Sequence, residues 1–237
     1  MKKAVFMSML LILLTACVIY SPQFAPTNII KYVQKHVVAI TVAYPNPEAE
    51  YSEFVEPYEM YIGSGVIIPG NRILTVAHLL NHGEVAKITA IRPFDPAIIT
   101  CSIISITDQS DDPTNDYALL SMDKDLKLPG LILAEQDAVI GEKVIFAGTV
   151  GGLCITRFGY STQFKWLFIK RDGKAVLTNW QKDYFLTVYP GGNGDSGGTI
   201  TNIRGEIVGM MYCGVEIYGE SYIFSNPMHR LREFLNK

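Results

Sequence analysis

The amino-acid sequence predicts an all-β protein, and three observations support this fold class. Short apolar runs recur along the chain, separated about every eight to twelve residues by Gly, Pro, Asn or Asp, as in a β-sandwich or barrel. No run with helical periodicity and comparable length competes with them. The chain has 237 residues with a hydrophobic fraction of 49%, enough to build one large β domain or two small barrels.

The first segment, residues 1–17, has the layout of a bacterial export signal. Lys2 and Lys3 precede the apolar run Ala4–Leu14. Residues 14–17, Leu-Thr-Ala-Cys, resemble the lipobox of bacterial lipoproteins, in which the cysteine is diacylated and becomes the mature N-terminus. This resemblance implies lipidation at Cys17 and attachment to a membrane. Residues 18–36 are then a tether, and the rest of the chain lies in the bacterial periplasm or cell envelope.

Two alternatives to the lipoprotein signal stay open, a simple signal peptide and an uncleaved anchor. Residues 4–20 are apolar, and about 17 to 25 such residues cross a bilayer, so an anchor is at the short limit. All three alternatives place the rest of the chain outside the cytoplasm.

The strands follow the tether, and each expected strand is a short apolar run bounded by turn-forming residues. In chain order they are Val37–Ala43, Tyr61–Ile68, Arg72–Ala77, Val85–Arg92, Ile98–Ile106, Lys143–Gly148, Phe164–Lys170, Lys174–Thr178, Tyr184–Tyr189 and Ile207–Tyr212. A helix closes the chain, because Asn226 suits the N-cap and Pro227 the first helical position. Met228, Leu231 and Leu235 then share one face.

The motif that carries most chemical information is residues 194–198, Gly-Asp-Ser-Gly-Gly. Glycines let the main chain bend so that two amides converge on one point. A serine that attacks a carbonyl needs such amides to stabilise the oxyanion that forms. We therefore expect Ser196 to be a nucleophile, and the amides of Gly194 and Ser196 to form an oxyanion hole.

Two upstream motifs supply partners for the serine. Residues 74–78, Leu-Thr-Val-Ala-His, form an apolar strand that delivers His78. Residues 115–120, Asn-Asp-Tyr-Ala-Leu-Leu, place Asp116 at the head of an apolar run. Asp111 and Asp112 are alternative acids, although a solvated loop is their simpler interpretation.

Together these motifs resemble the signatures of the chymotrypsin-like serine proteases, Thr-Ala-Ala-His, Asp-Ile-Ala-Leu and Gly-Asp-Ser-Gly-Gly. The chain matches them at residues 75–78, 116–119 and 194–198, and Gly63–Ile67 is similar to the family's strand before the histidine. Three motifs in this order are far more specific than any one of them. In style the chain is similar to the catalytic domains of the bacterial periplasmic quality-control (HtrA-like) proteases. Since the sequence ends with the expected helix, no PDZ peptide-binding module is expected after the catalytic domain.

The resemblance implies a fold of two packed six-stranded antiparallel β-barrels with a short C-terminal helix. The first barrel is expected in residues 37–128, the second in 129–225 and the helix in 226–237, with the joint near 126–131. His78 and Asp116 from the first barrel then meet Ser196 from the second across the cleft.

The resemblance also implies an activity, that of an exported serine endopeptidase. Its triad of His78, Asp116 and Ser196 cleaves a protein or peptide substrate through an acyl-enzyme intermediate. No activation sequence of the Ile-Val-Gly-Gly type occurs, because Lys35–Ile40 lacks the glycines. We therefore expect a constitutively active enzyme without zymogen cleavage. Asp195, which pairs with the new amino terminus in zymogen members, then needs another partner, and the sequence does not identify it.

The pocket for the side chain before the cut maps by resemblance to Pro190, Tyr212, Gly214 and Glu220. Pro190 stands where trypsin-like specificity needs an aspartate. A carboxylate of Glu220 at the pocket wall favours Lys or Arg. If Glu220 is instead an exposed hairpin tip, the pocket suits small or medium apolar residues, and both alternatives stay open.

Two other function classes remain, an esterase on the same fold and a catalytically silent binding relative. An α/β-hydrolase is excluded because no aspartate follows Ser196 and a hairpin, not a helix, comes after it. The net charge of −3 argues against nucleic-acid binding. No Walker loop or metal-spaced His/Cys cluster occurs, so neither a cofactor nor a metal is expected.

Two further features have simple interpretations. If Cys17 is lipidated, at least one of Cys101, Cys154 and Cys213 is unpaired, and three buried thiols acting as small apolar residues are favoured. Five glutamates make residues 45–61 acidic, and a solvated hairpin or loop is favoured over a surface that selects a partner.

Overall fold

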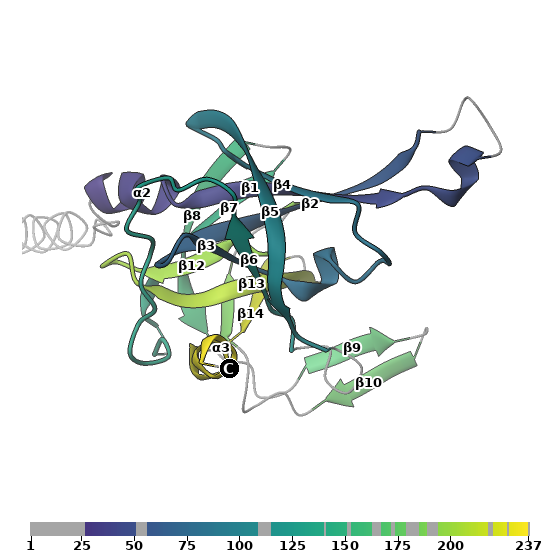
Figure 1. Cartoon of the computed structure of the whole chain (residues 1–237). Helices are drawn as coiled ribbons and strands as arrows, with labels where there is room; N and C mark the ends of the chain where they lie inside the picture. Colours follow the sequence, from purple (N-terminus) through teal and green to yellow (C-terminus); the bar gives the residue numbers. More distant parts are fainter. Residues whose placement is uncertain are drawn as a thin grey trace, which may run out of the picture.

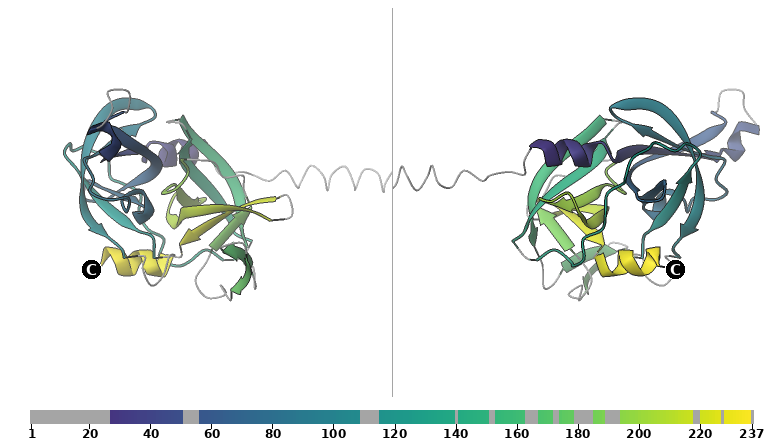
Figure 2. Two further views of the ribbon diagram at one scale, coloured as in Figure 1. Left: turned by 90° about the vertical axis from the view of Figure 1, so that its right-hand side faces the viewer. Right: turned by 60° about the vertical axis from the view of Figure 1, so that its left-hand side comes forward.

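The computed structural model describes residues 27–236 except 51–55, 109–114, 140, 151–152, 163–166, 172–173, 179–184, 189–193, 218–219 and 227. For the strands within residues 150–188 and 213–224 it describes the backbone alone. Two β-barrels lie side by side, each a closed antiparallel sheet (Figures 1 and 2). The predicted all-β fold with two barrels and a C-terminal helix is confirmed.

The first barrel has six strands in the order β1-β2-β3-β6-β5-β4. They are β1 Val37–Pro45, β2 Tyr58–Ile68, β3 Arg72–Thr75, β4 Lys87–Arg92, β5 Asp95–Ile106 and β6 Ala118–Met122. Nearly every residue of β1 is buried, on both of its faces. One face points into the barrel and the other packs toward β7 of the second barrel, which explains why β1 has an unbroken apolar run.

The second barrel has the strand order β11-β14-β13-β12-β7-β8, and pairing of β11 with β8 closes it. Its strands are β7 Lys143–Val150, β8 Leu153–Thr162, β11 Phe185–Val188, β12 Thr199–Asn202, β13 Ile207–Ile217 and β14 Glu220–Asn226. Strands β9 Leu167–Arg171 and β10 Lys174–Thr178 form a separate hairpin.

The link between the barrels is hydrogen bonded to both. Leu131 N donates to Ile67 O of the first barrel at 2.9 Å, and Ala134 N donates to Ile207 O of the second at 2.8 Å. Gly130 has a φ of 78°, and a Cβ there would lie 2.3 Å from the carbonyl carbon of Ile68. Only glycine fits this position, so the path of the chain from the first barrel to the second is fixed at Gly130.

Two strands, β8 and β14, were not expected from the sequence, whereas β6 is the apolar run expected after Asp116 and β12 belongs to the hairpin expected after Ser196. Strands β8 and β14 contain many polar residues, so a search for apolar runs misses them. Strand β3 ends at Thr75, earlier than expected, because a short 3-10 helix, η2, follows at Ala77–Leu79. Parts of the expected strands Phe164–Lys170 and Tyr184–Tyr189 lie outside the described residues.

The expected tether contains a helix, α2, at Thr27–Gln34. Val33 is completely buried, and Ile29 packs against the same core. The helix lies against β7 and β8, so tertiary burial of one short face stabilises a segment whose sequence is too short to form a helix alone. Among the described residues, neither helix has the length and hydropathy needed to cross a bilayer.

His36, between α2 and β1, is a buried histidine held in one orientation. Its Nδ1 donates to the carbonyl oxygen of Tyr32 at 2.8 Å, and only 2% of the residue is exposed. Burial lowers the pKa of His36, and the nearby charges of Lys35 and Arg92 lower it further, against the opposing effect of the Tyr32 hydrogen bond. The folded chain therefore holds this imidazole in its neutral form below the pH at which the unfolded chain protonates it.

We expect this depressed pKa to make the fold less stable as the pH falls below about 6.5, the ordinary histidine pKa. In that range the unfolded state binds a proton that the folded state does not, so the free energy of unfolding decreases by at most about 1.4 kcal/mol per pH unit. Urea unfolding from pH 7.5 to 5.0 measures it. His36→Asn, which keeps a donor for Tyr32 O but does not titrate, should show a shallower decline; an identical decline in both proteins would contradict the assignment.

The helix α3, Met228–Leu235, fits against both barrels (Figure 2). It contacts β13, and Phe234 stacks on Tyr117 with ring centroids 5.5 Å apart. Its first-turn amides donate to Asp137, with Met228 N at 2.6 Å and His229 N at 3.2 Å from Oδ1. The prediction of Asn226 as the N-cap is therefore wrong, because Asp137 from the interbarrel link takes that role.

Cys101 on β5 is a free, buried thiol. Burial, with a smaller contribution from the charge of Asp123, raises the pKa of Cys101 to about 12. A thiol with this pKa is not a thiolate at neutral pH, so it acts as a small apolar residue, as expected. The side chains of Cys154 and Cys213 lie outside the described part of the structure.

Candidate active site

His78 lies on η2, immediately after β3 of the first barrel. Its neighbours Ala77 and Leu79 are buried, while 37% of the His78 side chain is exposed. Leu79 O accepts a hydrogen bond of 2.7 Å from the Tyr44 hydroxyl, which ties the turn to β1. The apolar neighbours thus hold the turn in the core and leave the imidazole at the surface.

Asp116 holds His78 with both carboxylate oxygens. Oδ2 lies 2.6 Å from His78 Nδ1, and Oδ1 accepts from the His78 backbone amide at 2.8 Å. Only 1% of Asp116 is exposed, so these donors replace the water that the carboxylate loses. With Nδ1–H donated to the carboxylate, Nε2 carries the free lone pair and can accept a proton.

The neighbouring strands explain why these two side chains meet. Strand β3 pairs with β6, with Thr75 opposite Ala118, so the residues after β3 and before β6 lie at the same end of the barrel. From the second barrel, Asn226 Nδ2 donates to Asp116 O at 3.4 Å. The alternative acids Asp111 and Asp112 lie outside the described residues.

Ser196 lies in a tight turn before β12. Gly194 and Gly197 have φ values of 99° and 84°, in the left-handed region that favours glycine. Inside the turn, Gly198 N donates to Asp195 O, and Gly197 N donates to Met211 O, each at 2.8 Å. In the described part of the chain, the amides of Gly194 and Ser196 find no such acceptor. These are the two amides that the sequence analysis predicts to form the oxyanion hole.

A network centred on Ser64 of β2 connects this turn to the first barrel. Ser64 N donates to Ser196 O at 2.7 Å, and Ser64 Oγ donates to Gly194 O at 2.6 Å. Thr75 Oγ1, near the end of β3, donates to Ser64 O at 2.7 Å. The serine turn is thus hydrogen bonded, through one residue, to the strand that leads to His78.

The same network extends to the second barrel through Thr149 on β7. Thr149 N donates to Ser64 Oγ at 2.7 Å, and the two hydroxyls lie 3.0 Å apart. Ser64, Thr75 and Thr149 are completely buried. Sequence reasoning did not assign them a role, although Ser64 and Thr75 stand inside two of the quoted motifs. The sequence signal that could have identified them is a polar residue within an otherwise apolar strand, because a buried hydroxyl needs a hydrogen-bond partner.

Asp195 is completely buried beneath the turn. A Cβ added at Gly148 of β7 would lie 3.0 Å from Asp195 Oδ1, and one added at Gly198 would lie 2.8 Å from Asp195 O. The Asp195 carboxylate therefore packs against the β7 backbone, where only a glycine leaves it room.

The expected pocket residues are only partly described. Tyr212, half-buried, and Gly214 lie on β13, and Gly214 pairs with Ile223 of β14. Glu220 begins β14 opposite Ile217, at the end of the β13–β14 hairpin, and its side chain is outside the described part. Pro190 and Cys17 lie outside the described residues altogether. Within the described residues, no group of three or more His, Cys, Asp or Glu side chains is placed to hold a metal ion.

Comparison with known proteins gives consistent results. The family model of the trypsin-like peptidase domain matches residues 63–210, which include all three motif residues. The periplasmic serine endoprotease DegP of Salmonella typhimurium is 26% identical over 157 residues, which is 64% of this chain and 30% of DegP. The serine protease HTRA1 of Xenopus tropicalis is 29% identical over 178 residues, 73% of this chain and 35% of that protein. The chain thus spans about a third of the length of these relatives.

Solved structures share the fold. The active form of the Rv3671c protease from M. tuberculosis superposes with a TM-score of 0.64 at 19% identity, covering 92% of this chain and 86% of that one. Its inactive form gives a TM-score of 0.62 at 18% identity, covering 91% and 95%.

Proposed function

We propose that the chain, which belongs to the family of trypsin-like peptidase domains, is a serine endopeptidase whose catalytic triad is His78, Asp116 and Ser196. The observation that carries this proposal is the double hydrogen bond between Asp116 and His78. It orients the imidazole and leaves Nε2 as the proton acceptor. The network through Ser64 and Thr75 supports the third member, because it holds the Ser196 turn against the strand that leads to His78.

In the proposed reaction, Ser196 Oγ attacks the carbonyl carbon of the scissile peptide bond while His78 Nε2 takes the hydroxyl proton. The amides of Gly194 and Ser196 stabilise the oxyanion. The tetrahedral intermediate then collapses, the C–N bond breaks, and His78 delivers its proton to the leaving amine. Water, deprotonated by His78, hydrolyses the acyl-enzyme and regenerates Ser196. Asp116 stabilises the imidazolium in both steps.

We also propose that the site is formed without zymogen cleavage. The Ser196 turn is held by hydrogen bonds from Ser64, a residue of a strand, and not by a chain terminus. Asp195 is already buried against Gly148. These contacts support a constitutively active enzyme.

Cellular location is a further part of the proposal. The export signal, the lipobox-like residues 14–17 and the similarity to a protease named as periplasmic support a lipid-anchored enzyme of the cell envelope. Metabolic labelling of growing cells with a radioactive fatty acid tests it: Cys17→Ser should remove the label. Label that persists in this variant would contradict lipidation at Cys17, and a wild-type chain without label would leave an uncleaved anchor or a simple signal.

The catalytic proposal is tested with a fluorophosphonate, which reacts with an activated serine. Wild-type chain should be labelled at Ser196, as located by mass spectrometry, while Ser196→Ala and His78→Ala should not be labelled. A folded wild-type chain that stays unlabelled would overturn the constitutive triad and favour the silent binding relative. Hydrolysis of a peptide amide then separates an endopeptidase from an esterase, which would cleave only the corresponding ester.

A further inference from the structure

Strands β1 and β2 continue beyond the first barrel as a projecting arm, whose described residues are 44–50 and 56–60, with the short helix η1 at Pro47–Glu50 (Figure 1). A hollow of about 760 Å³ lies between this arm and the loop that follows His78. Its lining is Tyr44, Pro45, Asn46, Pro47, Ala49, Glu50, Pro57, His82, Gly83 and Glu84. The size is that of a site for several side chains of a ligand.

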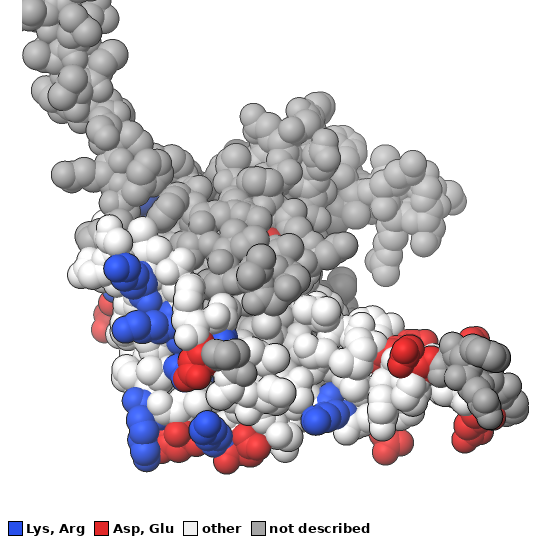
Figure 3. Space-filling model, turned by 90° about the horizontal axis from the view of Figure 1, so that it is seen from above, with Lys and Arg blue, Asp and Glu red and all other residues white. Residues whose placement is uncertain are grey.

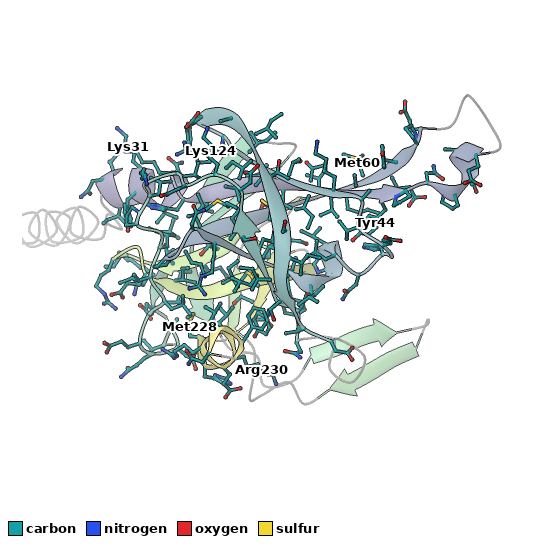
Figure 4. The ribbon with its side chains drawn as sticks, in the orientation of Figure 1. Lys31, Tyr44, Met60, Lys124, Met228 and Arg230 are labelled. Atoms are coloured by element: carbon teal, nitrogen blue, oxygen red, sulfur yellow. The ribbon has the colours of Figure 1, made fainter. Side chains whose placement is uncertain are left out.

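The walls of the hollow are mainly the rings of proline, tyrosine and histidine side chains. Three prolines line the arm side, and His82 stacks on Tyr61 with centroids 3.9 Å apart. Tyr44 points from the arm toward the same loop, whereas Met60 lies on the opposite face of the arm (Figure 4). Proline and aromatic rings both pack well against the aliphatic stems of long side chains, and an aromatic ring such as that of Tyr44 also attracts cations.

Charge on the arm is of one sign. Between Lys35 and Arg72 the sequence contains five glutamates and no lysine, arginine or aspartate. Glu50 and Glu84 line the hollow from its two sides, and Glu48, Glu56 and Glu59 are exposed on the same arm. Figure 3 shows these acidic residues along the arm. The basic residue Lys87 of β4 pairs with Ala43 of β1, next to Tyr44 at the base of the arm.

The hollow is also connected to the candidate active site. His82 is four residues after His78. Tyr44, which lines the hollow, donates a hydrogen bond from its hydroxyl to Leu79 O, next to His78. A polypeptide bound here therefore lies beside the turn that carries the general base.

We propose that this hollow is a docking site for a lysine- or arginine-bearing segment of the polypeptide substrate, away from the scissile bond; the link to cleavage rests on the proposed function. The prolines and rings pack against the stem of the basic side chain, and Glu50 and Glu84 pair with its charge. Because docking raises the local concentration of the substrate at Ser196, it lowers KM and leaves kcat nearly unchanged.

Binding is measured first, with the full chain carrying Ser196→Ala so that no cleavage intervenes. Fluorescence anisotropy follows a labelled peptide with a Lys-Lys-Lys tail, and the same peptide with Gln-Gln-Gln. The lysine peptide should bind more tightly, and Glu50→Gln with Glu84→Gln should weaken it about tenfold at low salt. A matched double variant, Glu135→Gln with Glu233→Gln, removes two exposed carboxylates elsewhere and should change nothing. Equal affinity for both peptides, or equal losses in both double variants, would overturn the docking site.

Cleavage is measured second, with active chain and quenched fluorescent peptides that carry the tail at either end. The Glu50/Glu84 double variant should raise KM for the lysine peptide about tenfold and leave its kcat and the glutamine peptide unchanged. If the lysine peptide binds through Glu50 and Glu84 but no peptide is cleaved, the proposed function fails while the docking site stands. If both peptides are cleaved and the double variant has no effect, only the docking site fails.

Discussion

Asp116→Asn is expected to lower kcat/KM for a peptide substrate about 10⁴-fold, while the chain stays folded. Asparagine has one acceptor oxygen, whereas the Asp116 carboxylate accepts from both His78 N and His78 Nδ1. If the amide group of asparagine faces the ring, Nδ1 must become the acceptor and Nε2 carries the proton. His78 in that tautomer cannot deprotonate Ser196. Steady-state hydrolysis of a peptide amide measures the loss.

A matched substitution separates this effect from a loss of stability. Asp123 also accepts a backbone hydrogen bond, from Thr100 N at 3.1 Å, but it lies outside the candidate active site. Asp123→Asn should keep kcat/KM within about twofold of wild type, and thermal unfolding should show both variants folded. Activity of Asp116→Asn within tenfold of wild type would mean that Asp116 does not orient the catalytic histidine.

Gly197→Ala should have the second large effect, on stability as well as on activity. A Cβ at this position would lie 2.0 Å from Ser64 O and 2.5 Å from Thr75 Oγ1, and φ is 84°. The substitution therefore combines an unfavourable backbone conformation with a clash against backbone that cannot move cheaply. We expect the free energy of unfolding to fall by at least about 3 kcal/mol. Displacement of the Ser196 turn should reduce kcat at least about 100-fold.

Gly141 provides the control, because it has the same φ of 84° but a Cβ there meets nothing within 4 Å. Gly141→Ala should cost only about 1 kcal/mol, the price of the backbone conformation alone. Urea unfolding of both variants isolates the contribution of the clash, and peptide hydrolysis tests the turn. Equal destabilisation by the two substitutions would show that contact with Ser64 does not constrain the Ser196 turn.

Most of the strands could be predicted because burial leaves a local trace in the sequence. Strand β1, buried on both faces, is an unbroken apolar run, and Ile207–Ile217 begins as another. Strand β14 and helix α2 leave a weaker trace, because their neighbours in space stabilise them more than their own composition does. Val33 of α2 is completely buried in the folded chain, where the helix lies against β7 and β8.

The candidate site divides in the same way. His78, Asp116 and Ser196 were identifiable because each stands in a short motif whose residue types serve a chemical need. Ser64 and Thr149 were not, since their importance lies in hydrogen bonds to residues far away in the chain. The cap of α3 could not be predicted for the same reason. Asp137, and not Asn226, accepts from Met228 N, and these two residues are 91 positions apart in the chain.

Residue order was thus sufficient for the fold class, the motif residues and the reaction type, because apolar runs and reactive side chains are local properties. Three features required the folded chain. They are the double hydrogen bond of Asp116 to His78, the Ser64 network that joins the barrels under Ser196, and the acidic hollow beside the β1–β2 arm. Each depends on distances between residues distant in sequence. The first and the third require the first barrel to close, and the second requires the two barrels to pack together.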